Sequence, residues 1–97
     1  MHYLLIYDYV PDYMARRAEV RAAPVAHARE SIARDELVLG GAFADEPPGA
    51  VLLFTASSPA VVEEFARVDP YVLNGLVTRW RVREWKTVVG TDAASLL

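Results

Sequence analysis

Two side chains in this sequence could exchange a proton with a bound molecule near neutral pH, His27 and Asp69. His27 falls in the first turn of a predicted helix, about 200° around the helix axis from Val25. At that end the helix dipole favours the neutral imidazole, which can accept a proton near pH 7. Taken alone, the same histidine is also explained as an ordinary exposed residue. Asp69 precedes Pro70, and this pair is equally typical of a helix cap followed by the first helical residue.

Few other residues suggest chemistry. Arg21 is either a surface charge or an anchor for an anion, and Tyr7 and Tyr71 are more typical of a core or a pocket rim than of acids or bases. The chain has no cysteine, and its paired serines before Pro59 read as a helix cap, so covalent catalysis is disfavoured. With His2 expected on the surface, one useful histidine and no carboxylate cluster, we expect no catalytic metal and no cofactor.

Composition narrows the class of protein. The chain has 97 residues, of which 54% are apolar and 24% charged, with a net charge of −3. This predicts one globular domain over residues 1–97, with a core at about residues 2–89 and a frayed tail at 90–97. The acidic balance argues against nucleic-acid binding. No apolar run is long enough to cross a membrane and no signal peptide is recognised, so we expect a cytoplasmic protein.

The elements that must position these residues follow from hydrophobic patterning and from proline. Pro24 interrupts a run of helix-forming residues, which predicts a short helical turn followed by a main helix whose buried stripe is Val25, Ala28 and Ile32. The expected elements are a strand at 2–9, helices at 13–21 and 24–35, strands at 37–43 and 50–56, a helix from 59 that stops before 69, a loop or one-turn helix at 69–75, and a strand at 78–89.

The order βαββαβ predicts an α+β fold, the ferredoxin-like two-layer sandwich with both helices on one face of a four-stranded antiparallel sheet. In the first strand Leu4 and Ile6 face opposite to the tyrosines, and in the third strand both faces are apolar as well. Because the helices cover only one face, we expect the open face to form a homodimer by stacking sheet on sheet.

Five segments together resemble the YCII-related (YciI-like) family over about residues 2–89. They are HYLLIYDYV at the start, Arg21 and His27 in R-x5-H, LVLGGAF, the SSP helix cap, and DPYVLNGLVTRWRVREW. The resemblance implies a ferredoxin-like homodimer of the dimeric α/β-barrel superfamily, with His27 and Asp69 as a His–Asp pair. That superfamily includes muconolactone isomerase-like enzymes and cofactor-free monooxygenases. The family's usual arginine, three residues before the histidine, is Pro24 here, and Arg21 lies three residues further back.

The leading hypothesis is a small cofactor-free enzyme of isomerase or lyase type that transfers a proton on a small organic molecule able to carry a negative charge. A carboxylate bonded to one ring nitrogen would orient the imidazole and raise its basicity. His27 would then be the acid/base and Asp69 its orienter. The remaining site residues expected are Arg21 as an anchor, with Gly41, Phe43, Tyr71 and Tyr7 shaping the pocket.

Two other functions fit the same residues. The first is a non-catalytic dimeric module that binds a small molecule or regulates, since a fold does not fix a function. The second is a dimeric α/β-barrel monooxygenase, of haem or quinone type, in which His27 could serve as an axial ligand.

Overall fold

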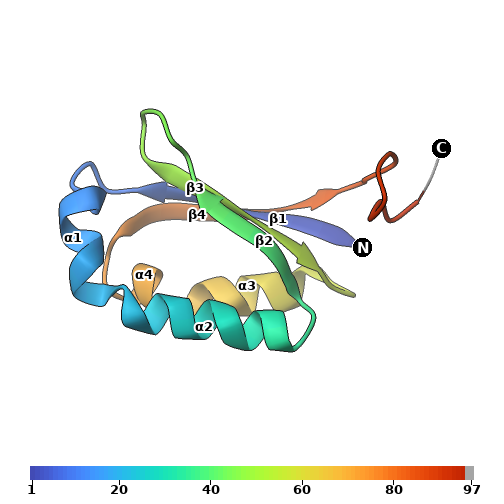
Figure 1. The fold of residues 1–97 in the computed structure, drawn as a ribbon, viewed down its shortest axis with the longest axis horizontal. Helices are drawn as coiled ribbons and strands as arrows, with labels where there is room; N and C mark the ends of the chain where they lie inside the picture. The colour runs from blue at the N-terminus through green and yellow to red at the C-terminus, as the bar shows by residue number, and fades with distance from the viewer. Residues whose placement is uncertain (96–97) are drawn as a thin grey trace.

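The computed structural model describes residues 1–95 and forms two layers, with every helix on the same face of one sheet (Figure 1). The predicted fold class is therefore confirmed, and the helices lie in the four segments where helical structure was expected. The elements are β1 (His2–Tyr9), α1 (Tyr13–Val20), α2 (Ala22–Ala33), β2 (Leu37–Ala42), β3 (Gly49–Thr55), α3 (Pro59–Val68), α4 (Pro70–Leu73) and β4 (Val77–Trp85).

The sheet is antiparallel with strand order β2-β3-β1-β4, so the first strand lies in its centre. In β1 the odd-numbered residues from Tyr3 to Tyr9 are buried under the helices. Their even-numbered neighbours Leu4 and Ile6 lie on the open face and are only partly covered. The period-two pattern of the sequence thus sets which side chains meet the helices.

The division between α1 and α2 has a local cause. Pro24 has no N–H to donate to the carbonyl of Val20, four residues before it, and α1 ends at Val20. Pro24 is tolerated in the first turn of α2, where N–H groups lack helical partners in any case. Arg21 between them keeps helical dihedral angles (φ −62°, ψ −37°). The chain nevertheless bends at Arg21, so α1 and α2 run in clearly different directions (Figure 1).

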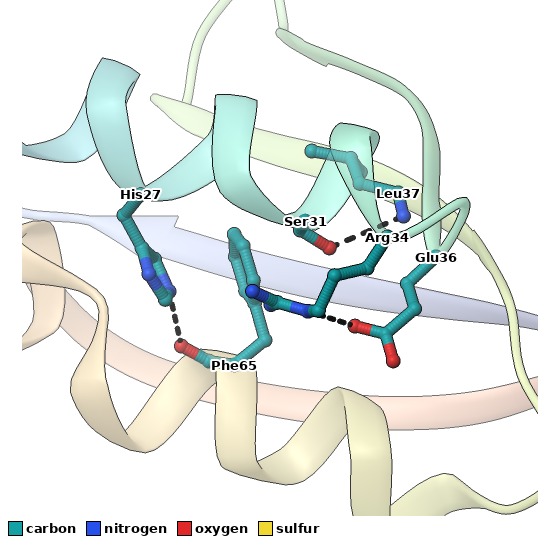
Figure 2. A network of polar contacts seen from close by, with 6 residues as sticks. All are labelled: His27, Ser31, Arg34, Glu36, Leu37 and Phe65. Atoms are coloured by element: carbon teal, nitrogen blue, oxygen red, sulfur yellow. Dashed lines mark hydrogen bonds and ion pairs between the residues drawn. The ribbon is translucent and has the colours of Figure 1, made fainter.

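The predicted buried stripe of α2 is wrong at two of its three positions, since Ala28 alone packs against the core. Val25 and Ile32 are 36% and 52% exposed, whereas Pro24 and Ser31 are buried. The helix is rotated by about one residue because Ser31 is drawn inward, where its Oγ accepts a hydrogen bond of 3.2 Å from the Leu37 amide (Figure 2). That bond ties the end of the helix to the start of β2.

The turn from α2 to β2 is short and charged. Asp35 has a positive φ of 60°, a left-handed conformation that aspartate tolerates better than most residues. On either side of it, Arg34 and Glu36 form an ion pair of 2.9 Å (Figure 2). This turn leads into β2, the edge strand that contains Gly40 and Gly41.

The last strand ends earlier than predicted, at Trp85 rather than at residue 89. Within residues 1–95, β4 pairs only with β1, and Trp85 lies opposite His2, the first residue of β1, so the pairing ends there. His2 is 8% exposed and contacts the Thr87 hydroxyl at 2.6 Å, which corrects its expected surface position. Residues 90–95 of the predicted frayed tail are bonded back to Thr87 through the Ala94 and Ser95 amides, and 96–97 lie outside the described residues.

Candidate functional site

A cavity of about 380 Å³ lies between the α1–α2 pair and the helix-facing side of the sheet. It is mostly apolar, with a group of tyrosines and two arginines on its wall. We call it the tyrosine pocket, after Tyr7, Tyr9, Tyr13 and Tyr71. The remaining lining residues are Arg17, Arg21, Val25, Ala28, Ile32, Leu37, Leu39, Gly40, Gly41, Ala42, Ala50 and Leu52. Val25 and Ile32 are exposed because they line this hollow instead of the packed core.

Asp69 lies directly behind the pocket wall, between α3 and α4. As expected from the Asp-Pro pair, it caps α4: its Oδ1 accepts a 2.9 Å hydrogen bond from the Tyr71 amide. Its second oxygen is not used by the cap. Oδ2 accepts a hydrogen bond of 2.6 Å from the hydroxyl of Tyr7, in the centre of the sheet. The carboxyl is 3% exposed, so its contact with the pocket passes through Tyr7.

The surroundings of Asp69 and Tyr7 favour the uncharged forms of both side chains. Burial raises the pKa of the Asp69 carboxyl above its ordinary range, while the bonds from Tyr7 and Tyr71 and the charge of His27 pull it down. Burial and the neighbouring carboxylate raise the pKa of Tyr7, and burial raises that of Tyr71 to about 12. The phenols are therefore neutral donors near pH 7, and Asp69 is a more basic carboxylate than an exposed one.

His27 is half-buried and points towards α3, not towards solvent as its position opposite the expected stripe had implied (Figure 2). Its ring stacks on Phe65 with centroids 4.2 Å apart, and Nε2 is 3.0 Å from the Phe65 carbonyl oxygen. Because a carbonyl can only accept, Nε2 carries the proton, which leaves Nδ1 as the basic nitrogen of a neutral ring. The tautomer is thus fixed by a backbone carbonyl.

The structure does not join His27 to Asp69. Among residues 1–95 no hydrogen bond links the two side chains, and Asp69 is occupied by Tyr7 and the Tyr71 amide. His27 lines a different cavity, of about 430 Å³ between α2 and α3, that shares no lining residue with the tyrosine pocket. The imidazole is still near enough for its positive charge to lower the pKa of Asp69.

The other expected site residues divide between two places. Arg21, Gly41, Tyr7 and Tyr71 all line the tyrosine pocket. Phe43 does not: it lies beyond the end of β2, beside Gly49, and lines a groove on the open face. The reason is that β2 ends at Ala42, so Phe43 belongs to the hairpin that leaves the sheet.

Sequence reasoning missed two of the four tyrosines and one of the two arginines on the pocket wall. Tyr9 and Tyr13 stack face to face, 3.8 Å apart at an angle of 3°, and Tyr71 meets both rings edge-on at 6.1 and 5.9 Å. Arg17 was missed too, although it shares the spacing of four residues with Tyr13 and Arg21. That spacing was the available signal, since residues four apart lie on one face of a helix.

The helices among residues 1–95 include none that is long and apolar enough to span a membrane. In the same part of the chain, no three His, Cys, Asp or Glu side chains come together as a metal site.

Comparison with solved structures identifies proteins of the same fold. One is the 5-chloro-2-hydroxyhydroquinone dehydrochlorinase TftG from Burkholderia phenoliruptrix AC1100, in complex with 2,5-dihydroxybenzoquinone. It is 24% identical, with a TM-score of 0.77 over 90% of this chain and 95% of that chain. Protein Atu4242 from Agrobacterium tumefaciens is 14% identical, with a TM-score of 0.57 over 99% and 100% of the two chains. Rv0793 from Mycobacterium tuberculosis is 20% identical, with a TM-score of 0.51 over 97% of each chain.

No curated protein matches the sequence. A family model does, however: that of the YCII-related domain matches residues 1–86, which span all eight helices and strands. The match agrees with the resemblance carried by the DPYVLNGL segment and the opening strand. The chain belongs to the YCII-related domain family.

Proposed function

We propose that this protein is a small-molecule enzyme that transfers a proton, in an isomerisation or an elimination, on a compound bound in the tyrosine pocket. The observation that carries the proposal is the 2.6 Å hydrogen bond from Tyr7, which lines the pocket, to the buried carboxylate of Asp69. A basic carboxylate reached through a neutral phenol is a suitable general base.

In the proposed step, the Tyr7 oxygen accepts the acidic proton of the substrate while the Tyr7 hydroxyl proton moves to Oδ2 of Asp69. The bond that loses the proton leaves its electron pair on the substrate, where it forms the new double bond or expels a leaving group. Because the pKa of Tyr7 is raised, the two proton movements are expected to be concerted, without a free tyrosinate. The reverse movement returns a proton to the product.

His27 remains in the proposal as the acid/base partner of Asp69. Its support is electrostatic: the charged ring stabilises the carboxylate and so lowers the pKa of Asp69. No direct bond joins the two side chains in residues 1–95, where Nε2 of His27 contacts the Phe65 carbonyl and the two oxygens of Asp69 accept from Tyr7 and Tyr71. We therefore expect His27 to tune the base, and Asp69 with Tyr7 to carry the proton.

The fold neighbour suggests a reaction and a probe. TftG is a dehydrochlorinase, and loss of HCl is an elimination that begins or ends with proton transfer. Its ligand, 2,5-dihydroxybenzoquinone, is a flat ring of the kind that packs against tyrosine side chains. We propose compounds of this shape as ligands of the tyrosine pocket.

The test is hydrogen–deuterium exchange at the ring carbons of 2,5-dihydroxybenzoquinone in D₂O, followed by proton NMR. We expect the protein to accelerate exchange above the buffer rate. Tyr7→Phe and Asp69→Asn should each lower the accelerated rate by about 10²–10⁴, and His27→Gln should lower it less. Arg29→Gln, on the exposed side of α2, is the control and should leave it unchanged.

Two results would contradict the proposal. Exchange that is accelerated equally by the wild type, Tyr7→Phe and Asp69→Asn would place the chemistry elsewhere. Binding of the probe in the tyrosine pocket without accelerated exchange would instead favour a non-catalytic ligand-binding module.

We also propose that the open face of the sheet binds a second copy of the chain. Its support is a half-exposed apolar surface: Leu4, Ile6, Val51 and Leu53 are only partly covered, and Leu39 is 71% exposed. These residues line or border a shallow groove of about 650 Å³. Leu53→Lys should convert a dimer to a monomer in size-exclusion chromatography with light scattering, whereas Val68→Lys on α3 should not. A monomeric wild type at micromolar concentration would contradict this.

A further inference from the structure

One stripe of side chains runs along α1 and α2 into the tyrosine pocket, and its chemistry changes along its length. It begins with Tyr13, continues with Arg17 and Arg21, and ends with apolar residues at Val25, Ala28 and Ile32. Spacings of three or four residues keep the side chains within each helix on one face. The chain bends at Arg21, and side chains from both helices line the same pocket. The pocket therefore has a basic, phenolic end and an aliphatic end.

Among the described residues, neither arginine of the stripe has an acidic partner. In the part of the chain from residue 1 to 95, ion pairs join Arg34 to Glu36 and Arg67 to Glu64, and neither pair includes Arg17 or Arg21. The residues described on the pocket wall include no aspartate or glutamate. The adjacent Arg16 differs, because it donates a 3.2 Å hydrogen bond to the Asn74 carbonyl and lies outside the pocket.

Arg17 and Arg21 place positive charge in the pocket of a protein whose net charge is negative. With a net charge of −3, the protein would repel an anion on average. A guanidinium presents two parallel N–H donors that match the two oxygens of a carboxylate. The guanidiniums of Arg17 and Arg21 lie one helical turn apart, and no carboxylate on the described pocket wall competes for them. They therefore make the pocket locally positive in a protein whose net charge is negative.

We infer that Arg17 and Arg21 form a clamp for the anionic group of the ligand, and that the ligand is an organic carboxylate with a flat apolar body. This rests on the proposed function, in that it uses the same pocket. The carboxylate lies between the two guanidiniums, near the stacked Tyr9–Tyr13 pair. The apolar body extends towards Val25 and Ile32. Tyr7 then faces the part of the ligand next to the anionic group.

The test compares 2-naphthoate with 2-naphthamide, which have nearly the same shape but differ in charge. Binding is followed by ¹H–¹⁵N NMR titration of the wild type, Arg17→Gln, Arg21→Gln and the control Arg29→Gln. The wild type should bind the acid at least about tenfold more tightly than the amide. Arg17→Gln and Arg21→Gln should each reduce that preference about five- to tenfold without changing the affinity for the amide. Arg29→Gln should keep it.

The outcomes separate this inference from the proposed function. Equal binding of naphthoate and naphthamide by the wild type, or an unchanged preference in both pocket variants, would overturn the clamp while leaving a ligand pocket in place. If neither compound shifts the resonances of pocket residues, the ligand site fails and the clamp fails with it. A preference that weakens from 20 to 300 mM NaCl would support the clamp, because screening acts on the charged ligand alone.

Discussion

Tyr7→Phe removes a single oxygen atom and tests the central contact of the site. The Tyr7 ring is 1% exposed, and its hydroxyl donates to Oδ2 of Asp69 at 2.6 Å. Phenylalanine keeps the ring and its packing, so the variant isolates the hydrogen bond. Asp69 would retain only the bond from the Tyr71 amide, to its other oxygen.

The size of the effect depends on the charge of Asp69. A hydrogen bond to an ionised group contributes about 1.5–3 kcal/mol, and one between neutral groups about 0.5–1.5 kcal/mol. We therefore expect Tyr7→Phe to lower the free energy of unfolding by about 2–3 kcal/mol when Asp69 is ionised. In a domain of this size, that corresponds to a fall in Tm of about 10 °C or more.

The sign of the pH dependence follows from the raised pKa of Asp69. Between its ordinary unfolded value, about 3.9, and its folded value, the native state binds more protons than the unfolded state. Stability is then greatest below that window and falls as the pH rises through it. Without the Tyr7 hydroxyl the folded pKa rises further, so the fall is deeper and extends to higher pH. The loss caused by Tyr7→Phe should be small at pH 4 and largest at pH 8.

The measurement is urea unfolding between pH 4 and pH 8, followed by the fluorescence of Trp80 and Trp85. Asp69→Asn and the double variant complete a double-mutant cycle, which isolates the coupling between the two side chains. Asp69→Asn alone should flatten the pH dependence in this window. A loss of stability for Tyr7→Phe that is the same at every pH would refute the argument, because it would show that the bond does not depend on the carboxylate charge.

Three glycines give contrasting predictions, each checked by urea unfolding. Gly49→Ala should destabilise strongly, by about 3 kcal/mol or more, because its Cβ would lie 2.6 Å from the backbone oxygen of Tyr7; a stable variant would contradict the strand spacing. Gly41→Ala meets nothing within 4 Å and should change stability by less than about 1 kcal/mol. Gly40→Ala would bring a methyl group 3.2 Å from Leu52 Cγ on the pocket wall. It should leave the fold intact but weaken 2-naphthoate binding severalfold by NMR titration, and unchanged binding would place the ligand elsewhere.

The sequence by itself determined the local structure and the family. Alternation in His2–Tyr9 set which faces of β1 are buried, because successive side chains of a strand point to opposite sides. Pro24 and Pro59 marked the first turns of helices, because proline fits where no N–H partner is needed. Asp69 before Pro70 was recognised as a cap, and the structure shows it as one.

Only the tertiary structure decided what these residues contact. The rotation of α2 depended on a bond from Leu37 to Ser31, and it turned His27 towards Phe65, away from the tyrosine pocket. The partner of Asp69 is Tyr7, which is 62 residues away in the chain, so no local sequence pattern pairs them. Helical and strand periods fix directions within one element, whereas a distance between elements depends on how their side chains pack. The sequence therefore indicated which residue types could carry chemistry, whereas only the fold showed which of those residues contact one another.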